Sequence, residues 1–179
     1  MVNVVIEPER PDDAQAVATV VRRAFAHQPG VDAMVAAIRR SPRYRPDLAL
    51  VARACEQVVG FVMLSGTDLV NRSAGDRHEV LTLTPLAVDP DYQRRGIGAA
   101  LVRAAVRAAD QSGEPLIVLE GSPRYYGRLG FRHAGDHGIT IDLPEGVPLT
   151  AAQVFLLGAH DPSVQGHVEY PPAIAEVAS

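Results

Sequence analysis

The sequence predicts one α/β domain spanning residues 1–179 and built on a mixed β-sheet. The stretch Leu81–Gln111 changes from an apolar, β-prone run to helical spacing across a glycine-containing turn. The runs Leu48–Cys55 and Val58–Ser65 flank the polar pair Glu56-Gln57, which is typical of a β-hairpin. Strand and helix patterns also alternate without a linker, repeat or low-complexity tract, which favours a single domain.

The N-terminal third predicts one short strand and two helices. Val4–Ile6 is β-prone, and prolines follow it. Asp12 with Gln15 forms a capping-box-like helix start, after which apolar residues recur at helical spacing. Residues 28–30, Gln-Pro-Gly, end that helix. A shorter helix then places four apolar residues on one stripe, interpreted as core: Val31, Met34, Val35 and Ile38.

The remaining elements follow from changes in pattern. Residues 71–77 are polar and predict a loop before a strand over His78–Val88. The helix that follows Gly98 is ended by Gly113 and Pro115. Residues 116–119 are predicted to form a strand buried on both faces, and residues 123–129 a short helix. Residues 131–141 are predicted to be extended, and residues 153–157 to form another strand. After Tyr170 the chain is expected to be an irregular tail.

Composition excludes several classes of protein. Apolar residues make up 47% and charged residues 21% of a chain with net charge −4, which argues against binding nucleic acid through its phosphates. The apolar runs are too short for a membrane span, and the N-terminus lacks a signal pattern, so a cytoplasmic protein is expected. The six histidines show no metal-binding spacing, and no metal site is predicted. The one cysteine, Cys55, cannot form an internal disulfide and is interpreted as a small buried hydrophobe.

The turn between the central strand and its helix predicts an anion-binding site. Helix N-termini present N–H groups without partners, and glycines let a phosphate approach the backbone. No P-loop string occurs. A dinucleotide fingerprint would use Gly96, Gly98 and Glu120, but it needs Gly or Ala where Leu101 stands. An NAD(P)-binding oxidoreductase is therefore kept as the alternative.

Two segments carry a more specific resemblance. Residues 93–98, Gln-Arg-Arg-Gly-Ile-Gly, fit the pattern Gln/Arg-x-x-Gly-x-Gly/Ala, and residues 126–131 fit Tyr-x-x-x-Gly-Phe. In this order the pair resembles the GNAT superfamily of N-acetyltransferases, most closely its YhbS-like branch. The resemblance implies a mostly antiparallel sheet of about six to seven strands with helices on both faces. It also implies acetyl-CoA as co-substrate and direct transfer of the acetyl group to a primary amine of a small molecule or peptide.

The resemblance assigns roles to individual residues. Tyr126 would protonate the departing CoA thiolate, and its neighbour Tyr125 is expected to be a half-buried packing residue. Where many members have asparagine, this chain has Ser122, and where some have a catalytic glutamate it has Thr82. The implied cofactor-binding residues are Leu86, Ala87, Val88, Gln93, Arg94, Arg95, Gly96, Ile97, Gly98, Ala99 and Ser122.

The general base is His78, Glu79 or a water relay. The acceptor pocket is expected along Ala26–Ile38 and the loop after Val70, without a cluster of acidic residues that would identify the amine. A non-catalytic acyl-CoA-binding sensor remains a further alternative, and the sequence does not decide whether the chain forms a homodimer.

Overall fold

The structure is a computed structural model, and it describes residues 3–178. These residues form two compact units. The first unit comprises the described residues up to Ser65 together with Leu83–Ala108, and the second comprises Gly66–Thr82 and the described residues from Ala109 onward. The predicted domain also includes residues 1, 2 and 179, which lie outside the described part of the chain.

The first unit combines antiparallel strands with three helices. Its strands follow the order β1-β2-β3-β4, and β2 pairs antiparallel with both β1 and β3. Strands β3 and β4 and the last turn of α3 continue into the second unit. The elements are β1 (Val4–Pro8), α1 (Ala14–Ala24), α2 (Val31–Arg39), β2 (Tyr44–Ala54), β3 (Gln57–Asn71), β4 (Asp76–Val88) and α3 (Ile97–Gln111).

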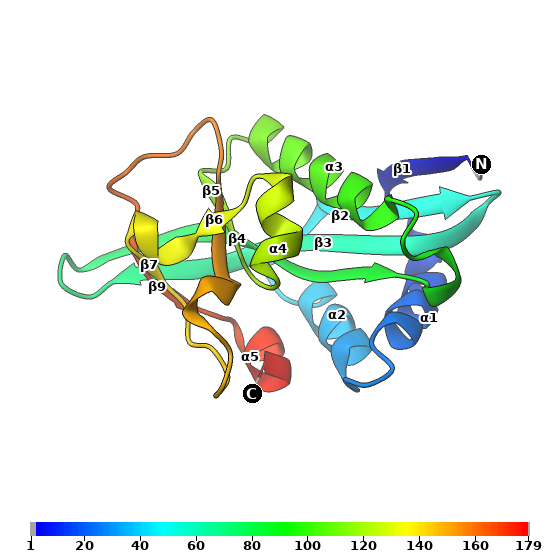
Figure 1. Cartoon of the computed structure of the whole chain (residues 1–179), viewed down its shortest axis with the longest axis horizontal. Helices are drawn as coiled ribbons and strands as arrows, with labels where there is room; N and C mark the ends of the chain where they lie inside the picture. Colours follow the sequence, from blue (N-terminus) through cyan, green and yellow to red (C-terminus); the bar gives the residue numbers. More distant parts are fainter. Residues whose placement is uncertain (1–2, 179) are drawn as a thin grey trace. The chain divides into compact units, whose positions relative to one another are not determined.

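Helices cover both faces of the strands in the first unit, as Figure 1 shows for α3 on one side and α1 and α2 on the other. Neighbouring residues of a strand point to opposite faces, and β3 shows this directly. A Cβ atom at Gly60 would lie 2.9 Å from Leu101 Cδ1 of α3. The next residue, Phe61, faces α2, because the Arg39 guanidinium lies 5.7 Å from its ring centroid.

The second unit adds shorter strands to the ends of β3 and β4. Its strand order is β3-β4-β5-β8-β6, while β9 pairs antiparallel with β3 and parallel with β7. Strand β4 runs parallel to β5, and their ladder joins Leu81 to Ile117 and Thr82 to Val118. The further elements are β5 (Leu116–Glu120), α4 (Pro123–Tyr126), β6 (Arg132–His133), β7 (Ile139–Thr140), β8 (Ala152–Leu156), β9 (Gly166–Glu169) and α5 (Pro172–Ala178).

The predicted fold class is confirmed: the sheet is mixed and mostly antiparallel. Seven strands form its main path, as the predicted six to seven require, and β7 and β9 bring the total within residues 3–178 to nine. The predicted strand over 116–119 is buried at all four positions. One apolar cluster in the second unit includes Val80, Val118, Ile139 and Val168, with Tyr170 packed against it.

The hairpin between β2 and β3 corrects the prediction for Cys55. The turn is formed by Cys55 and Glu56, one residue earlier than expected, with φ of 45° and 67°. Two successive left-handed residues are the geometry of a type I′ turn, which matches the twist of paired strands. Cys55 is therefore exposed at the turn and is not a buried hydrophobe.

Both ends of the chain also differ from expectation. The Asp12–Gln15 capping pair does not form the start of α1; a 3₁₀ turn over Pro11–Asp13 precedes that helix, and the Asp13 carboxylate accepts from the Arg10 N–H at 2.9 Å. The expected irregular tail contains the helix α5, which begins at Pro172. Proline is compatible with the first position of a helix, because the N–H that it lacks would have no intrahelical acceptor there. No helix within residues 3–178 is long and apolar enough to cross a membrane.

Candidate active site

The loop between β4 and α3, in the first unit, is held by its own polar groups. The Asp89 N–H donates to the Val59 carbonyl at 2.9 Å, which fixes the end of β4 against β3. The Asp89 carboxylate accepts from the Asp91 N–H at 3.0 Å. The Gln93 amide donates to the Val88 carbonyl at 3.0 Å. Gln93, expected to bind cofactor, thus has a visible role in shaping the loop.

Two arginine side chains, those of Arg23 and Arg95, also hold this loop. Arg23 of α1 pairs with the Asp91 carboxylate at 2.9 Å and with that of Asp89 at 3.4 Å. Arg95 donates to the Asp91 carbonyl at 3.0 Å and lies 5.4 Å from the centroid of the Tyr92 ring. Asp89 is buried, so its pairing with Arg23 offsets the cost of removing a carboxylate from water.

Two of the last three loop residues before α3 are left-handed. Arg94 has φ of 61° and Gly96 has φ of 82°. A Cβ at Gly96 would meet nothing within 4 Å, so glycine is favoured there by backbone conformation rather than by space. The first intrahelical bond of α3 runs from the Ala100 N–H to the Gly96 carbonyl, at 3.0 Å. The N–H groups of residues 96–99 precede that bond and form the positive end of the helix.

This geometry confirms the predicted strand, turn and helix start. Gln93, Arg94, Arg95 and Gly96 are exposed, and Gly98 and Ala99 are partly exposed, whereas Ile97 is buried beneath the turn. Leu86, Ala87 and Val88 form the last residues of β4, with Ala87 buried and its two neighbours partly exposed. Ten of the eleven predicted cofactor-binding residues therefore lie in the first unit, and the eleventh, Ser122, lies in the second.

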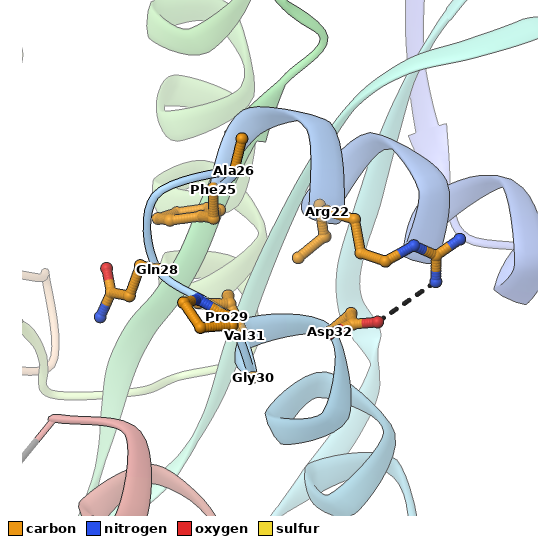
Figure 2. A pocket seen from close by; sticks show the side chains of 9 residues that line it. Arg22, Phe25, Ala26, Gln28, Pro29, Gly30, Val31 and Asp32 are labelled. Atoms are coloured by element: carbon orange, nitrogen blue, oxygen red, sulfur yellow. Dashed lines mark hydrogen bonds and ion pairs between the residues drawn. The ribbon is translucent and has the colours of Figure 1, made fainter.

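A pocket of about 240 Å³ opens between the end of α1 and the start of α2, within the first unit. Figure 2 shows the Arg22–Asp32 ion pair, 3.2 Å long, on one side of it and the Gln28 amide on the other. The pocket overlaps the start of the region expected to bind the acceptor, and Asp32 already has a cationic partner there. The lining residues are Val21, Arg22, Phe25, Ala26, Gln28, Pro29, Gly30, Val31 and Asp32.

In the second unit, α4 follows the carboxyl end of β5 and carries Tyr126. The Ser122 hydroxyl accepts from the Tyr125 N–H at 3.4 Å and caps α4. The ring of Tyr126 lies on Gly121, where a Cβ would come within 2.5 Å of its Cε2. Tyr126 also meets the Phe131 ring edge to face, with centroids 5.5 Å apart. The glycine thus creates the space that the tyrosine ring fills.

The two tyrosines of α4 differ in exposure. Tyr125 is 39% exposed and its ring meets the Tyr126 ring edge to face, whereas Tyr126 also packs on Phe131 and is the better packed of the two. Burial, with a smaller contribution from Tyr125, raises the pKa of the Tyr126 hydroxyl well above its usual range. Tyr126 therefore stays protonated at neutral pH and can donate a proton.

The candidates for the general base lie in the second unit. His78 is half-buried. Hydrogen bonds from Ser163 hold the pKa of the Asp161 carboxyl below its usual value, and His78 lies close enough to add a small part of this effect. Glu79 is exposed. Thr82 is 1% exposed and hydrogen bonds to the Tyr170 hydroxyl. No catalytic role was predicted for Tyr170 or for Glu120, which accepts a hydrogen bond from it. The sequence signal for Glu120 is a charge that ends an otherwise apolar strand.

Within residues 3–178, no group of three or more His, Cys, Asp or Glu side chains is placed to hold a metal ion. The sequence profile of the acetyltransferase (GNAT) domain matches residues 45–133. The Uncharacterized N-acetyltransferase YjhQ of Escherichia coli is 32% identical over 133 residues, which cover 74% of this chain and 72% of YjhQ. The chain belongs to the GNAT family.

Other GNAT proteins resemble this chain in sequence and in structure over most of its length. The Uncharacterized N-acetyltransferase YhbS of E. coli is 30% identical over 140 residues, covering 78% of this chain and 80% of YhbS. The crystal structure of E. coli YhbS in complex with CoA aligns with a TM-score of 0.85 at 29% identity, covering 98% of this chain and 93% of YhbS. A GNAT acetyltransferase from Brucella melitensis in complex with acetyl-CoA aligns with a TM-score of 0.76 at 26% identity, covering 97% and 99%.

Membership in the GNAT family confirms the resemblance drawn from the two motifs, including its YhbS-like branch. The chain is therefore an enzyme of the N-acetyltransferase class. The dinucleotide alternative gains no support from these relatives. Its expected ribose-binding acid, Glu120, is hydrogen bonded to Tyr170 inside the second unit.

Proposed function

We propose that this protein transfers the acetyl group of acetyl-CoA to a primary amine of a small molecule or peptide, by direct attack of the amine on the thioester. The observation that carries the proposal is the start of α3. Left-handed Arg94 and Gly96 lead into a helix whose first N–H groups have no intrahelical acceptor. The related YhbS and Brucella structures contain CoA and acetyl-CoA.

The pyrophosphate of acetyl-CoA suits this helix start. The N–H groups of residues 96–99 would donate to its oxygens, and the helix dipole favours its charge. Arg94 and Arg95 add positive charge on exposed side chains. The backbone of Leu86–Val88 would pair with the pantetheine arm, and an N–H there would polarise the thioester carbonyl. Ser122 keeps its hydroxyl proton for the cofactor, because its capping bond uses the oxygen as acceptor.

Transfer to an amine requires a neutral nucleophile, a polarised carbonyl and a stabilised leaving thiolate. Tyr126 supplies the last of these as a proton donor, since burial keeps its hydroxyl protonated. The mechanism needs no covalent intermediate on the protein. A nucleophilic serine or cysteine is therefore not part of the proposal.

The pocket between α1 and α2 is proposed as part of the acceptor site. Its volume of about 240 Å³ suits one side chain or a small amine. Phe25, Pro29 and Val31 give it apolar walls, and the Gln28 amide can both donate and accept. These features favour an acceptor with an apolar arm next to its amine.

Two measurements test the proposal together. A hundredfold excess of acetyl-CoA over its Kd should stabilise the folded protein by about 2.7 kcal/mol in thermal unfolding, while NAD or NADP should not. Release of free thiol should follow with amines, amino acids, aminoglycosides or lysine peptides. Stabilisation by NAD(P) alone would contradict the proposal. Binding of acetyl-CoA without thiol release by any acceptor would instead identify an acyl-CoA sensor.

A further inference from the structure

Three polar side chains from distant parts of the sequence meet in the second unit. Tyr170 follows β9, and its hydroxyl hydrogen bonds to the Glu120 carboxylate at the end of β5 and to Thr82 of β4. A carboxylate only accepts, so Tyr170 donates to Glu120 and accepts from the Thr82 hydroxyl. The bonds run in one direction, from Thr82 to Tyr170 to Glu120.

Strand pairing explains why these groups share a face. Thr82 is paired with Val118, and Glu120 stands two residues beyond Val118 on the same side of β5. Val118 belongs to the apolar cluster against which Tyr170 packs. The polar groups therefore lie at the end of that cluster, with Thr82 fully enclosed and Glu120 half-buried. Glu120 is thus less enclosed than Thr82.

Glu120 is also close to the proposed proton donor along the chain. The residue after Glu120 is Gly121, and the Tyr126 ring lies directly on it. The Gly121 carbonyl accepts from the Gln153 amide at 2.9 Å, and its N–H donates to the Ala151 carbonyl at 3.0 Å. The backbone between the carboxylate and the tyrosine ring is therefore fixed on both sides.

The surroundings of Glu120 make it a stronger base than an exposed glutamate. Burial raises the pKa of its carboxyl above the usual range, the hydrogen bond from Tyr170 opposes that rise, and the Asp142 carboxylate adds to it. The Asp142 carboxylate also lies 3.3 Å from Nε2 of His167. Burial also raises the pKa of Tyr170, which keeps that hydroxyl a donor.

We infer that Glu120 is the general base that takes a proton from the acceptor ammonium group, and that Tyr170 is the positioning residue that holds it. The inference rests on the proposed acetyltransferase function. It replaces the bases considered from sequence, His78, Glu79 or a water relay, with a carboxylate whose orientation is fixed by a neighbouring hydroxyl.

The protons balance over one turnover. The ammonium group gives one proton to Glu120, which later releases it to solvent, and the neutral amine forms the new C–N bond at the thioester carbonyl. The C–S bond breaks and the CoA sulfur leaves with its electron pair, taking a proton from Tyr126. The second amine proton, lost as the amide forms, restores the Tyr126 hydroxyl. The products are the amide, CoA thiol and one proton.

The test compares Glu120→Gln, Tyr170→Phe and the wild type in thiol release between pH 5 and 9, with phenethylamine, spermidine and hydroxylamine as acceptors. Glu120→Gln should lower kcat with an alkylamine by about 10²–10⁴-fold and leave acetyl-CoA affinity unchanged. With hydroxylamine, which is already neutral at neutral pH, the loss should be much smaller. Glu145→Gln removes an exposed carboxylate in a turn; it is the matched control and should behave as the wild type does.

Tyr170→Phe removes a bond that lowers the pKa of Glu120. The acidic limb of its kcat/KM profile should therefore move to higher pH, a change that a purely structural role would not produce. Wild-type rates in Glu120→Gln, or equal losses with hydroxylamine and alkylamines, would overturn the base role. If Glu120→Gln fails to fold, the Tyr170→Phe variant decides: an acidic limb of kcat/KM that stays at the wild-type pH would overturn the role of Glu120 as base. A wild type that binds acetyl-CoA but releases no thiol with any acceptor would contradict the proposed function itself, and with it the role of Glu120 as base.

Discussion

The guanidinium of Arg53 in β2 lies 2.7 Å from the carboxylate of Asp13, which precedes α1. A second bond of 2.7 Å joins Arg53 to Glu7 of β1. The Arg53 and Asp13 side chains are only 9% and 10% exposed, so their charges have been removed from most of the surrounding water. A buried pair of this kind contributes little when intact and leaves a costly lone charge when one partner is removed.

Arg53→Met should therefore lower the free energy of unfolding by about 3–5 kcal/mol, because the Asp13 carboxylate loses its buried partner. Urea unfolding followed by circular dichroism measures this. Arg22→Met is the control: the Arg22–Asp32 pair is exposed, and its loss should cost no more than about 1 kcal/mol. Equal effects of the two substitutions would contradict the burial argument.

The same pair predicts a dependence on pH. Burial opposes ionisation of Asp13, but hydrogen bonds from the Arg10 N–H and Arg53 outweigh it and hold the pKa of Asp13 below its usual value. A lowered folded-state pKa stabilises the protein above the unfolded value, about 3.9, and this stabilisation is lost as the pH falls through the folded pKa. The difference in unfolding free energy between wild type and Arg53→Met should shrink below about pH 4.

Gly98→Asp should abolish acetyl-CoA binding. The new carboxylate would stand in the first turn of α3 and repel the phosphates that its N–H groups are proposed to hold. Isothermal titration calorimetry measures the loss. Gln111→Asp adds the same charge at the far end of α3 and should bind acetyl-CoA as the wild type does. Undiminished binding by Gly98→Asp would place the phosphates elsewhere.

Arg23→Ala should weaken acetyl-CoA binding without contacting it. Arg23 ties α1 to Asp89 and Asp91, and these two shape the turn that precedes α3. Arg23 is half exposed, so the loss should stay within about fivefold and shrink as salt is raised. Calorimetry at about 50 and about 500 mM salt tests this, because added salt screens the interaction between exposed charges. A loss that does not depend on salt would contradict the ion-pair explanation.

Tyr126→Phe should lower kcat by about 10²–10⁴-fold while leaving acetyl-CoA affinity and melting temperature nearly unchanged, since the ring stays on Gly121. Because burial raises the pKa of Tyr126 above the usual value of about 10, no alkaline fall in kcat from this residue is expected below that pH. Tyr125→Phe should resemble the wild type. Similar losses in both variants would indicate damage to α4 rather than a lost proton donor.

Local patterns predicted the parts of the fold that local chemistry determines. The helical spacing after Gly98 predicted α3, and the apolar run before Glu120 predicted β5. The hairpin turn was misplaced by one residue because polarity pointed to Gln57, whereas the structure places its two left-handed residues at Cys55 and Glu56. Residue type alone did not reveal that conformation.

Long-range contacts were beyond such patterns. Thr82, Glu120 and Tyr170 meet because β4 and β5 pair in one register and the chain after β9 returns to the same face. Nothing in the local sequence of Tyr170 indicates a partner. The same holds for Arg53, which reads as an ordinary charge near a strand end and becomes a buried ion pair only through its contact with Asp13.

The exposed hairpin turn has a practical consequence for every assay that detects liberated thiols. Cys55 is the only cysteine of the chain, and it is exposed at the turn, so a disulfide reagent such as Ellman's will also titrate the enzyme itself, with one equivalent per chain. Because Cys55 has φ of 45°, Cys55→Asn is a suitable reagent-silent replacement: asparagine tolerates left-handed backbone. In the wild type, the same thiol offers a unique attachment point for a fluorescent or spin label.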